Sequence, residues 1–241
     1  MIHPIIYYCL FFLVLGGAGM YIANRKASPV VRRQRWLKYF IYILITTIVI
    51  TSILYHWFDL LAIVISGAGF FELIRANYLL TRRPYRGFLI VLLCFAIIAT
   101  GFFEFARTAD REMQLFIYFQ VFIFDAFSQV TGQIFGKRVL AKKISPSKTI
   151  EGFVGGTIFC IGAAILGRHW VNLQFGIALL AGVLTATTAL SGDLLASRFK
   201  RLVEIKDYSN ILPGQGGFLD RFDSLIATGA IYYIILLLTT R

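Results

Sequence analysis

Acidic and basic side chains alternate in one segment toward the end of the chain. Five carboxylates fall within the 31 positions from Asp193 to Asp223, and lysines and arginines are interleaved with them. Carboxylate oxygens are ligands that Mg²⁺ prefers, and lysine and arginine hold phosphate oxygens. The segment therefore has the side chains of a site for a metal-bound polyphosphate, although a solvated charged loop would have the same composition. The residues concerned are Asp193, Lys200, Arg201, Glu204, Lys206, Asp207, Asp220, Arg221 and Asp223.

Spacing favours the first interpretation. If the chain continues as a helix from Asp193, then Ser197 and Lys200 follow at intervals that place all three on one face. Asp220 and Asp223 are three positions apart, which places them on one face of a second helix at its start. Two helices that each carry carboxylates at one end are an arrangement able to hold a metal ion between them.

A Gly-rich turn lies between these two predicted helices. The chain reads Leu-Pro-Gly-Gln-Gly-Gly over 212–217, which is a rigid turn followed by small residues. Gly216 and Gly217 allow backbone N–H groups to approach a phosphate closely, and a helix beginning near Asp220 would offer its positive end. Together with the flanking carboxylates, the turn predicts a phosphate-binding site.

A second polar segment covers 131–151. Residues 132–137 look like a Walker A loop, but the loop is one residue short and Arg138 stands where Ser or Thr should be, so we reject that interpretation. Further along, we expect a Ser-Pro turn that presents Lys148 at the surface. Glu151 would then open the next helix, where an acidic residue complements the helix dipole.

Membrane-spanning helices must position these residues. The chain has 241 residues, of which 58% are hydrophobic and 15% charged, and its mean hydropathy is +0.75. These values exclude a water-soluble globule and a disordered chain. Eight segments have the roughly 20 apolar residues that a spanning helix needs: 4–23, 38–55, 57–75, 87–105, 113–130, 152–170, 173–191 and 224–240.

Lysine and arginine are distributed unevenly between the loops. Twenty of the 24 fall in alternate loops, which are therefore predicted to face the cytoplasm, with both termini outside. This topology accounts for the net charge of +12, so we expect no nucleic-acid partner. His3, His56 and His169 all fall at outer ends of the segments, which excludes histidine acid–base catalysis on the cytoplasmic side.

The expected fold is an all-α, polytopic membrane helical bundle of about eight transmembrane helices. Two long cytoplasmic loops, 131–151 and 192–223, carry the polar motifs. No repeat or domain boundary interrupts the chain. We therefore expect a single integral-membrane domain over 1–241, with N-terminal spans in 1–110 and a catalytic half in 113–241.

Two ionisable residues fall inside apolar segments. Asp125 lies near the cytoplasmic end of its segment, where such a residue is costly and is therefore a functional candidate. Glu72 is a weaker candidate, because Arg75 lies one helical turn away and suits it as an ion-pair partner.

In its motifs the chain resembles the phosphatidate cytidylyltransferases, which are the CDP-diacylglycerol synthases. The resemblance covers about the last 120 residues, and Asp125 lies where that family has an aspartate. The N-terminal half matches only as hydrophobic spans. The matching elements are Gly192-Asp193, Ser197-x-x-Lys200-Arg201, Lys206-Asp207, Gly216-Gly217, Asp220-Arg221-x-Asp223 and, upstream, Lys143-x-Ser145-Pro146-x-Lys148-Thr149-x-Glu151-Gly152.

The resemblance implies transfer of a cytidylyl group from CTP to phosphatidate, which gives CDP-diacylglycerol and pyrophosphate. It implies Asp193 and Asp220 as ligands of a catalytic Mg²⁺, with Asp223 supporting the metal or nucleotide, and leaves open a second cation such as K⁺. These three aspartates and Lys200 are the implied catalytic residues. The implied substrate-binding residues are Asp125, Lys148, Ser197, Arg201, Lys206, Asp207, Gln215, Gly216, Gly217 and Arg221.

The same resemblance implies a setting. The protein would reside in the bacterial inner membrane with its active site facing the cytoplasm, where CTP and the phosphatidate head group meet. It also allows a homodimer. The bilayer itself is then a partner, because the lipid tails stay in it during the reaction.

One position departs from the family pattern, and alternatives remain open. Gln215 stands where the family usually has His, and an amide can orient a phosphate or the base but cannot carry a proton. One alternative is a paralogue that acts on another lipid phosphate. A second is a catalytically inactive member that serves as a lipid-binding or scaffold subunit. A third is a transporter that uses Glu72 and Asp125, which the concentration of charges in loops disfavours.

Overall fold

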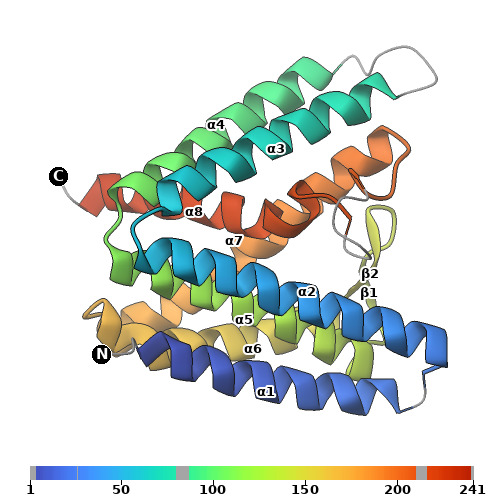
Figure 1. Ribbon diagram of the computed structural model, residues 1–241, viewed down its shortest axis with the longest axis horizontal. Helices are drawn as coiled ribbons and strands as arrows, with labels where there is room; N and C mark the ends of the chain where they lie inside the picture. Colours follow the sequence, from blue (N-terminus) through green and yellow to red (C-terminus); the bar gives the residue numbers. More distant parts are fainter. Residues whose placement is uncertain (1–3, 26, 80–86, 210–215, 240–241) are drawn as a thin grey trace. The chain divides into compact units, whose positions relative to one another are not determined.

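The computed structural model describes residues 4–25, 27–79, 87–209 and 216–239, and these ranges are overwhelmingly helical (Figure 1). Each of the eight apolar segments predicted from the sequence is a helix. The helices are α1 (Pro4–Asn24), α2 (Pro29–Leu54), α3 (Phe58–Tyr78), α4 (Phe88–Thr108), α5 (Arg111–Phe135), α6 (Ile150–Gly167), α7 (Phe175–Leu202) and α8 (Leu219–Thr239), with a 3-10 turn, η1 (Arg168–Trp170), after α6.

The prediction of an all-α, polytopic membrane protein is confirmed. Six helices within the described ranges are long and apolar enough to cross a membrane: α2, α4, α5, α6 with its 3-10 turn, α7 and α8. Several of them, including α2, α7 and α8, extend past their apolar segments into charged sequence. Pro29 starts α2 ahead of a basic stretch, since proline is well suited to a first helical position. The C-terminal end of α7 continues through Lys200 and Arg201, where cations complement the helix dipole.

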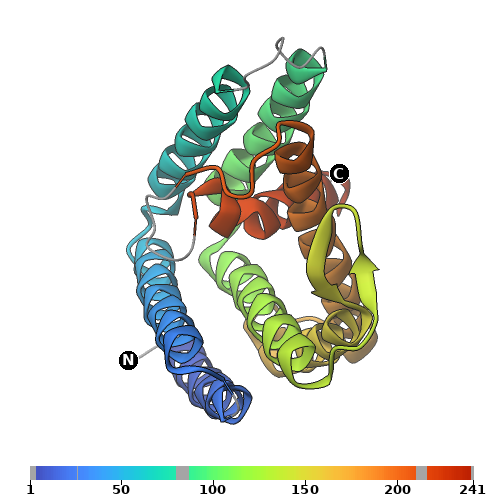
Figure 2. The same ribbon diagram turned by 90° about the vertical axis from the view of Figure 1, so that its right-hand side faces the viewer.

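One polar segment is not helical. β1 (Val139–Ala141) and β2 (Ser145–Thr149) form an antiparallel hairpin in which Val139 pairs with Thr149 and Ala141 with Ser145. The predicted Ser-Pro turn is wrong, because Ser145 and Pro146 lie within β2 and the turn is at 142–144. Proline is tolerated here because each strand of a two-stranded hairpin is an edge strand. Figure 2 shows the hairpin beside the ends of α5 and α6.

The chain divides into two compact units. Unit 1 comprises Met1–Ile48 and Leu115–Thr187, and unit 2 comprises Val49–Gln114 and Thr188–Arg241. Each unit therefore combines an earlier and a later stretch of sequence.

Unit 1 is built on α5. Phe12 of α1 packs edge-on against Phe119 of α5, with ring centroids 5.6 Å apart. Tyr42 of α2 donates its hydroxyl hydrogen to the carbonyl of Phe122 at 2.5 Å. On another side, a Cβ at Gly156 of α6 would lie 2.7 Å from the Cβ of Ser128, so this glycine allows α6 to approach α5 closely.

Unit 2 is built on α8, which is buried over most of its length. Gly229 of α8 faces Phe102 of α4, where a Cβ would lie 2.7 Å from the ring. On α3, a Cβ at Gly69 would lie 3.5 Å from the side chain of Leu219 at the start of α8. In Figure 1 α3 and α4 run side by side along this unit. The start of α8 thus contacts α3, and its middle contacts α4.

Candidate functional site

The site in unit 2 begins with one face of α7. Thr188, Gly192 and Lys200 are spaced by multiples of four, and each contacts α8. Thr188 and Thr228 share a hydrogen bond of 3.1 Å between their hydroxyl oxygens. A Cβ at Gly192 would lie 2.6 Å from the carbonyl oxygen of Asp223, so the two backbones touch at that point. The chain does continue as a helix from Asp193 through Lys200 to Leu202, so the predicted loop 192–223 is wrong over its first part.

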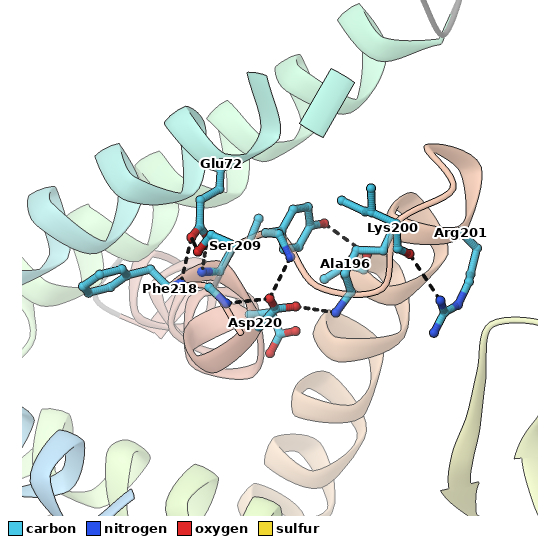
Figure 3. A network of polar contacts seen from close by, with 12 residues as sticks. Glu72, Ala196, Lys200, Arg201, Ser209, Phe218 and Asp220 are labelled. Atoms are coloured by element: carbon cyan, nitrogen blue, oxygen red, sulfur yellow. Dashed lines mark hydrogen bonds and ion pairs between the residues drawn. The ribbon is translucent and has the colours of Figure 1, made fainter. Parts of the chain in front are cut away.

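Lys200 forms a buried ion pair with Asp220. Its Nζ lies 2.5 Å from Oδ1 of Asp220, and the two side chains are only 10% and 2% exposed (Figure 3). The same ammonium group lies 5.4 Å from the centre of the Tyr208 ring. A buried charge is tolerated when it is paired and hydrogen-bonded. Lys200 is therefore held in place between a carboxylate and an aromatic face.

The second oxygen of Asp220 organises the turn before α8. Oδ2 accepts hydrogen bonds from the backbone N–H of Tyr208 at 2.9 Å and of Gly217 at 2.8 Å. Gly216 has φ of +85°, and a Cβ there would lie 2.7 Å from Oδ2 of Asp220. Glycine is thus required at this position by both conformation and space. The carboxylate of Asp220 joins α7, the loop and α8 at a single point.

Tyr208 fixes the loop against α7. Its hydroxyl donates to the carbonyl of Ala196 at 3.1 Å, and its ring stacks on Phe199 with centroids 6.2 Å apart. Burial raises the pKa of Tyr208, and the carboxylates of Asp223 and Asp220 raise it further. The side chain is therefore a neutral phenol that donates a hydrogen bond.

A helix cap turns the chain directly after Lys200. The N–H of Ile205 bonds to the carbonyl of Lys200 at 2.9 Å, and that of Glu204 bonds to the carbonyl of Arg201 at 3.2 Å. Glu204 has φ of +59°, which is the left-handed conformation of the residue that follows a helix closed by this bond pattern. The cap reverses the chain and brings Tyr208 back beside Lys200.

Glu72 on α3 is a residue for which the sequence predicts only a weaker candidate. Its side chain is buried, and its carboxylate accepts three hydrogen bonds from the loop and from the start of α8 (Figure 3). The donors are Ser209 Oγ at 2.6 Å, the Phe218 N–H at 3.0 Å and the Leu219 N–H at 2.8 Å. The signal was present, because an acidic residue in an apolar segment is a functional candidate by default. Proximity to Arg75 in sequence obscured it.

Two further carboxylates lie where α7 and α8 touch. Asp193 directly follows Gly192, whose backbone contacts Asp223, and both acids have a buried Oδ2 atom. Oδ1 of Asp223 accepts the N–H of Ser224 at 2.7 Å. Within the described residues, no three His, Cys, Asp or Glu side chains are grouped so as to hold a metal ion. Mg²⁺ commonly binds through one or two carboxylates and substrate phosphates, so the donor set fits an ion that arrives with a nucleotide.

The other predicted residues of unit 2 lie around this centre. Ser197 is buried on α7, one turn beyond Asp193. Gly216 lies against Asp207, because a Cβ added at Gly216 would lie 3.4 Å from the Cβ of Asp207. Gln215 lies outside the residues that the structure describes. The exposed members, which a solute can reach, are Arg201, Lys206, Asp207 and Arg221.

Asp125 and Lys148 lie in unit 1. Lys148 is half-buried in β2, and Asp125 is half-buried in α5. The hairpin is tied to α6 by Glu151, whose Oε2 accepts the N–H of Lys137 at 3.0 Å and of Arg138 at 3.1 Å. In a Walker A loop these N–H groups would bind phosphate, but here they donate to Glu151. This agrees with the rejection of that motif.

Comparison with known proteins gives a consistent assignment. A model of the cytidylyltransferase family matches residues 2–239. The phosphatidate cytidylyltransferase of Aquifex aeolicus (strain VF5) is 40% identical over 124 residues, which are 51% of this chain and 46% of the relative. That of Staphylococcus epidermidis (strain ATCC 35984) is 38% identical over 155 residues, 61% of this chain and 58% of the relative. That of Staphylococcus aureus (strain COL) is 34% identical over 150 residues, with the same coverage of 61% and 58%.

The chain spans about half the length of the curated relatives it matches, between 46% and 58%. The family model, in contrast, covers nearly the whole sequence. Since that match includes both helices of the site and the motif loop between them, the chain belongs to the cytidylyltransferase family.

Proposed function

We propose that the protein transfers a cytidylyl group from CTP to phosphatidate, forming CDP-diacylglycerol and pyrophosphate. The observation that carries this proposal is the polar cluster of unit 2, in which Lys200 and Asp220 are paired beside the contact of Gly192 with Asp223. The chain's family and the names of its relatives support the same reaction. A structural or transport role would not need this combination of acidic and basic groups.

The reaction is a displacement at the α-phosphorus of CTP. A phosphate oxygen of phosphatidate forms the new P–O bond, the bond from the α-phosphorus to the oxygen of the β-phosphate breaks, and pyrophosphate leaves with the electron pair. A phosphate monoester has a second pKa of about 6, so the nucleophile is largely ionised near neutral pH and needs no general base. The protein must therefore neutralise charge and align the two substrates.

Asp193 and Asp220 would hold Mg²⁺, with Asp223 in support. The ion, when bound, would neutralise phosphate charge and orient the leaving group. Oδ1 of Asp220 has room for a second interaction beside Lys200, because a carboxylate oxygen offers about two lone-pair sites. The cations assigned to phosphate oxygens are Lys148, Lys200, Arg201, Lys206 and Arg221, and the other substrate contacts are assigned to Asp125, Ser197, Asp207, Gln215, Gly216 and Gly217.

Gln215 is compatible with this chemistry. Because no general base is required, an amide that orients a phosphate or the cytosine can serve where relatives of the family use His. We expect the natural chain to be active, with a flatter pH profile than a Gln215→His variant. An inactive natural chain that gains activity through Gln215→His would contradict this.

We assign the protein to a bacterial inner membrane, with both motif loops in the cytoplasm. The distribution of lysine and arginine between loops supports this orientation. CTP would then reach the site from the cytoplasm while the lipid tails remain in the bilayer.

The test is release of pyrophosphate by the purified full chain in detergent micelles with CTP, Mg²⁺ and phosphatidate. We expect pyrophosphate to be released with phosphatidate and not with diacylglycerol. A panel of other lipid phosphates separates the proposal from a paralogue with a different lipid. No pyrophosphate with any lipid phosphate would overturn the proposed function and favour the scaffold alternative.

A further inference from the structure

Glu72 contacts the site from a helix that carries none of the motifs. It is 1% exposed, and its two carboxylate oxygens accept three hydrogen bonds. Oε1 accepts from Ser209 Oγ and from the N–H of Phe218, and Oε2 accepts from the N–H of Leu219. One side chain therefore holds both ends of the loop that the motif residues occupy.

Two of these donors are amides that a helix leaves without an internal partner. Leu219 is the first residue of α8 and Phe218 precedes it, so their N–H groups need an external acceptor. A carboxylate at a helix start also interacts favourably with the helix dipole. Glu72 supplies both effects from α3.

This arrangement determines where Asp220 can point. An aspartate in the first turn of a helix is able to accept hydrogen bonds from the N–H groups at its own helix start. Because Glu72 already binds two of those groups, the carboxylate of Asp220 is directed instead at Lys200, Tyr208 and Gly217. The orientation of Asp220 depends on an acceptor from another helix.

The fit around Glu72 is close. A Cβ at Gly217 would lie 2.3 Å from Oε1 of Glu72, so the carboxylate occupies the space that any other residue at 217 would need. Gly217 therefore leaves the space that the carboxylate of Glu72 needs. This close contact with the backbone indicates that Glu72 positions the turn and does not only neutralise a charge.

We propose that Glu72 is a positioning residue that fixes the start of α8 and directs Asp220 into the nucleotide site. The proposal rests on the function proposed above for the role of the site, while the anchoring of the loop can be measured by itself. Its substitution would disturb the geometry of Asp220 without removing any group that touches substrate.

The variant that tests this is Glu72→Gln in the full chain. Glutamine keeps the size of the side chain, but its NH₂ group would face a donor at one of the two oxygen positions. Glu104→Gln on α4 is the matched control, because Glu104 pairs with Arg107 on its own helix at 2.7 Å. Both variants replace one carboxylate by an amide within unit 2.

Two readouts decide the outcome. By hydrogen–deuterium exchange, the segment 216–222 should exchange at least about tenfold faster in Glu72→Gln, while the rest of α8 and α4 keep the wild-type rate. In the pyrophosphate assay, kcat should fall by about 10²-fold with little change in the KM for phosphatidate, as expected for a misplaced catalytic group. Glu104→Gln should match the wild type in both.

The contrary results are distinct. Wild-type exchange over 216–222 in Glu72→Gln would overturn the proposal, and so would faster exchange throughout α4 and α8, which would indicate general destabilisation. An active enzyme whose kcat is unchanged by Glu72→Gln would also overturn it. A wild-type chain without turnover would instead overturn the proposed function, and local loosening of 216–222 would still establish Glu72 as the anchor.

Discussion

The ammonium group of Lys200 lies 2.5 Å from Oδ1 of Asp220, across the contact between α7 and α8. Oδ2 of the same carboxylate accepts two backbone N–H groups, from Tyr208 and Gly217. Asp220 thus has a structural task in addition to any part in catalysis. Asp193 lies seven positions before Lys200 on α7, about two helical turns away, so the two aspartates can be compared by measurement.

Asp220→Asn should abolish turnover and also lower stability. An amide has one acceptor oxygen for three donors, and it leaves the Lys200 charge buried without a counterion. A cost of about 3–5 kcal/mol corresponds to a decrease in Tm of roughly 6–20 °C for a chain of this size. Asp193→Asn should abolish turnover with a smaller decrease in Tm, because it leaves the Lys200–Asp220 ion pair intact. Thermal unfolding in detergent, read beside the pyrophosphate assay, separates the two.

A double variant provides the control for this comparison. Lys200→Met in the Asp220→Asn background removes the unpaired charge, so the Tm should recover part of the loss while activity stays absent. Additive losses of Tm in the double variant would show that the ion pair is not what stabilises this contact.

Gly217→Ala should disable the site by steric conflict. Its Cβ would lie 2.3 Å from Oε1 of Glu72, and therefore the turn or the carboxylate must move. We expect a lower Tm and a loss of activity of about 10²-fold. Gly67→Ala on α3 is the control, because a Cβ there has no described atom within 4 Å, and it should be neutral or stabilising by up to about 1 kcal/mol. Equal behaviour of the two variants would be evidence against the contact with Glu72.

Tyr208 should contribute a dependence of stability on pH. Burial raises the pKa of this phenol above its ordinary value of 10.0, so above that pH the unfolded chain binds fewer protons than the folded chain. Stability contributed by the neutral phenol is therefore fully present below about pH 10 and is lost as the pH rises above that value toward the raised pKa of the folded chain. Tyr208→Phe should show a lower Tm at pH 8 but a shallower decrease at high pH.

The comparison variant for this experiment is Tyr55→Phe, in which an exposed phenol of the same unit is removed. It should retain the slope of Tm against pH that the wild type shows. If the slope of Tm against pH were the same in Tyr208→Phe and in the wild type, the phenol would ionise as easily in the folded chain as in the unfolded one. That result would contradict the prediction.

Lys148→Ala should weaken substrate binding more than it harms folding. We expect the KM for CTP or phosphatidate to rise by about tenfold, the loss of one charge-assisted hydrogen bond to phosphate. Lys142→Ala, in the exposed turn of the same hairpin, should leave both KM values near those of the wild type. Unchanged kcat and KM in Lys148→Ala would remove that residue from the phosphate-binding set.

Divalent metal should bind tightly only together with the nucleotide. Mg²⁺ usually binds through one or two carboxylates together with substrate phosphates and water, so we expect the phosphates of CTP to supply part of its coordination. Electron paramagnetic resonance of Mn²⁺ should show an affinity at least about tenfold higher with CTP present than without it. Chelation should abolish turnover without lowering the Tm, and tight binding of Mn²⁺ in the absence of CTP would contradict this prediction.

Hydropathy was sufficient to locate the eight helices of the described residues, of which six are long and apolar enough to cross a membrane. Helical spacing also placed Lys200 correctly on the face of α7 that meets α8. Sequence patterns were not sufficient for the β1–β2 hairpin, where Pro146 suggested a turn but lies in an edge strand.

Local spacing cannot show which distant group will accept a hydrogen bond. The partners of Glu72 are 137 to 147 positions away, and only the packing of α3 on α8 brings them together.

The long sequence separation between Glu72 and its donors has a consequence for biogenesis. The ribosome releases α3 well before it makes Ser209, which follows Glu72 by 137 residues, and before it begins α8. Until then the carboxyl group of Glu72 lacks its final hydrogen-bond donors, because they have not been synthesised. The formation of α3 and its docking on the start of α8 must therefore be separate events in time, and the second must wait for the translation of α8.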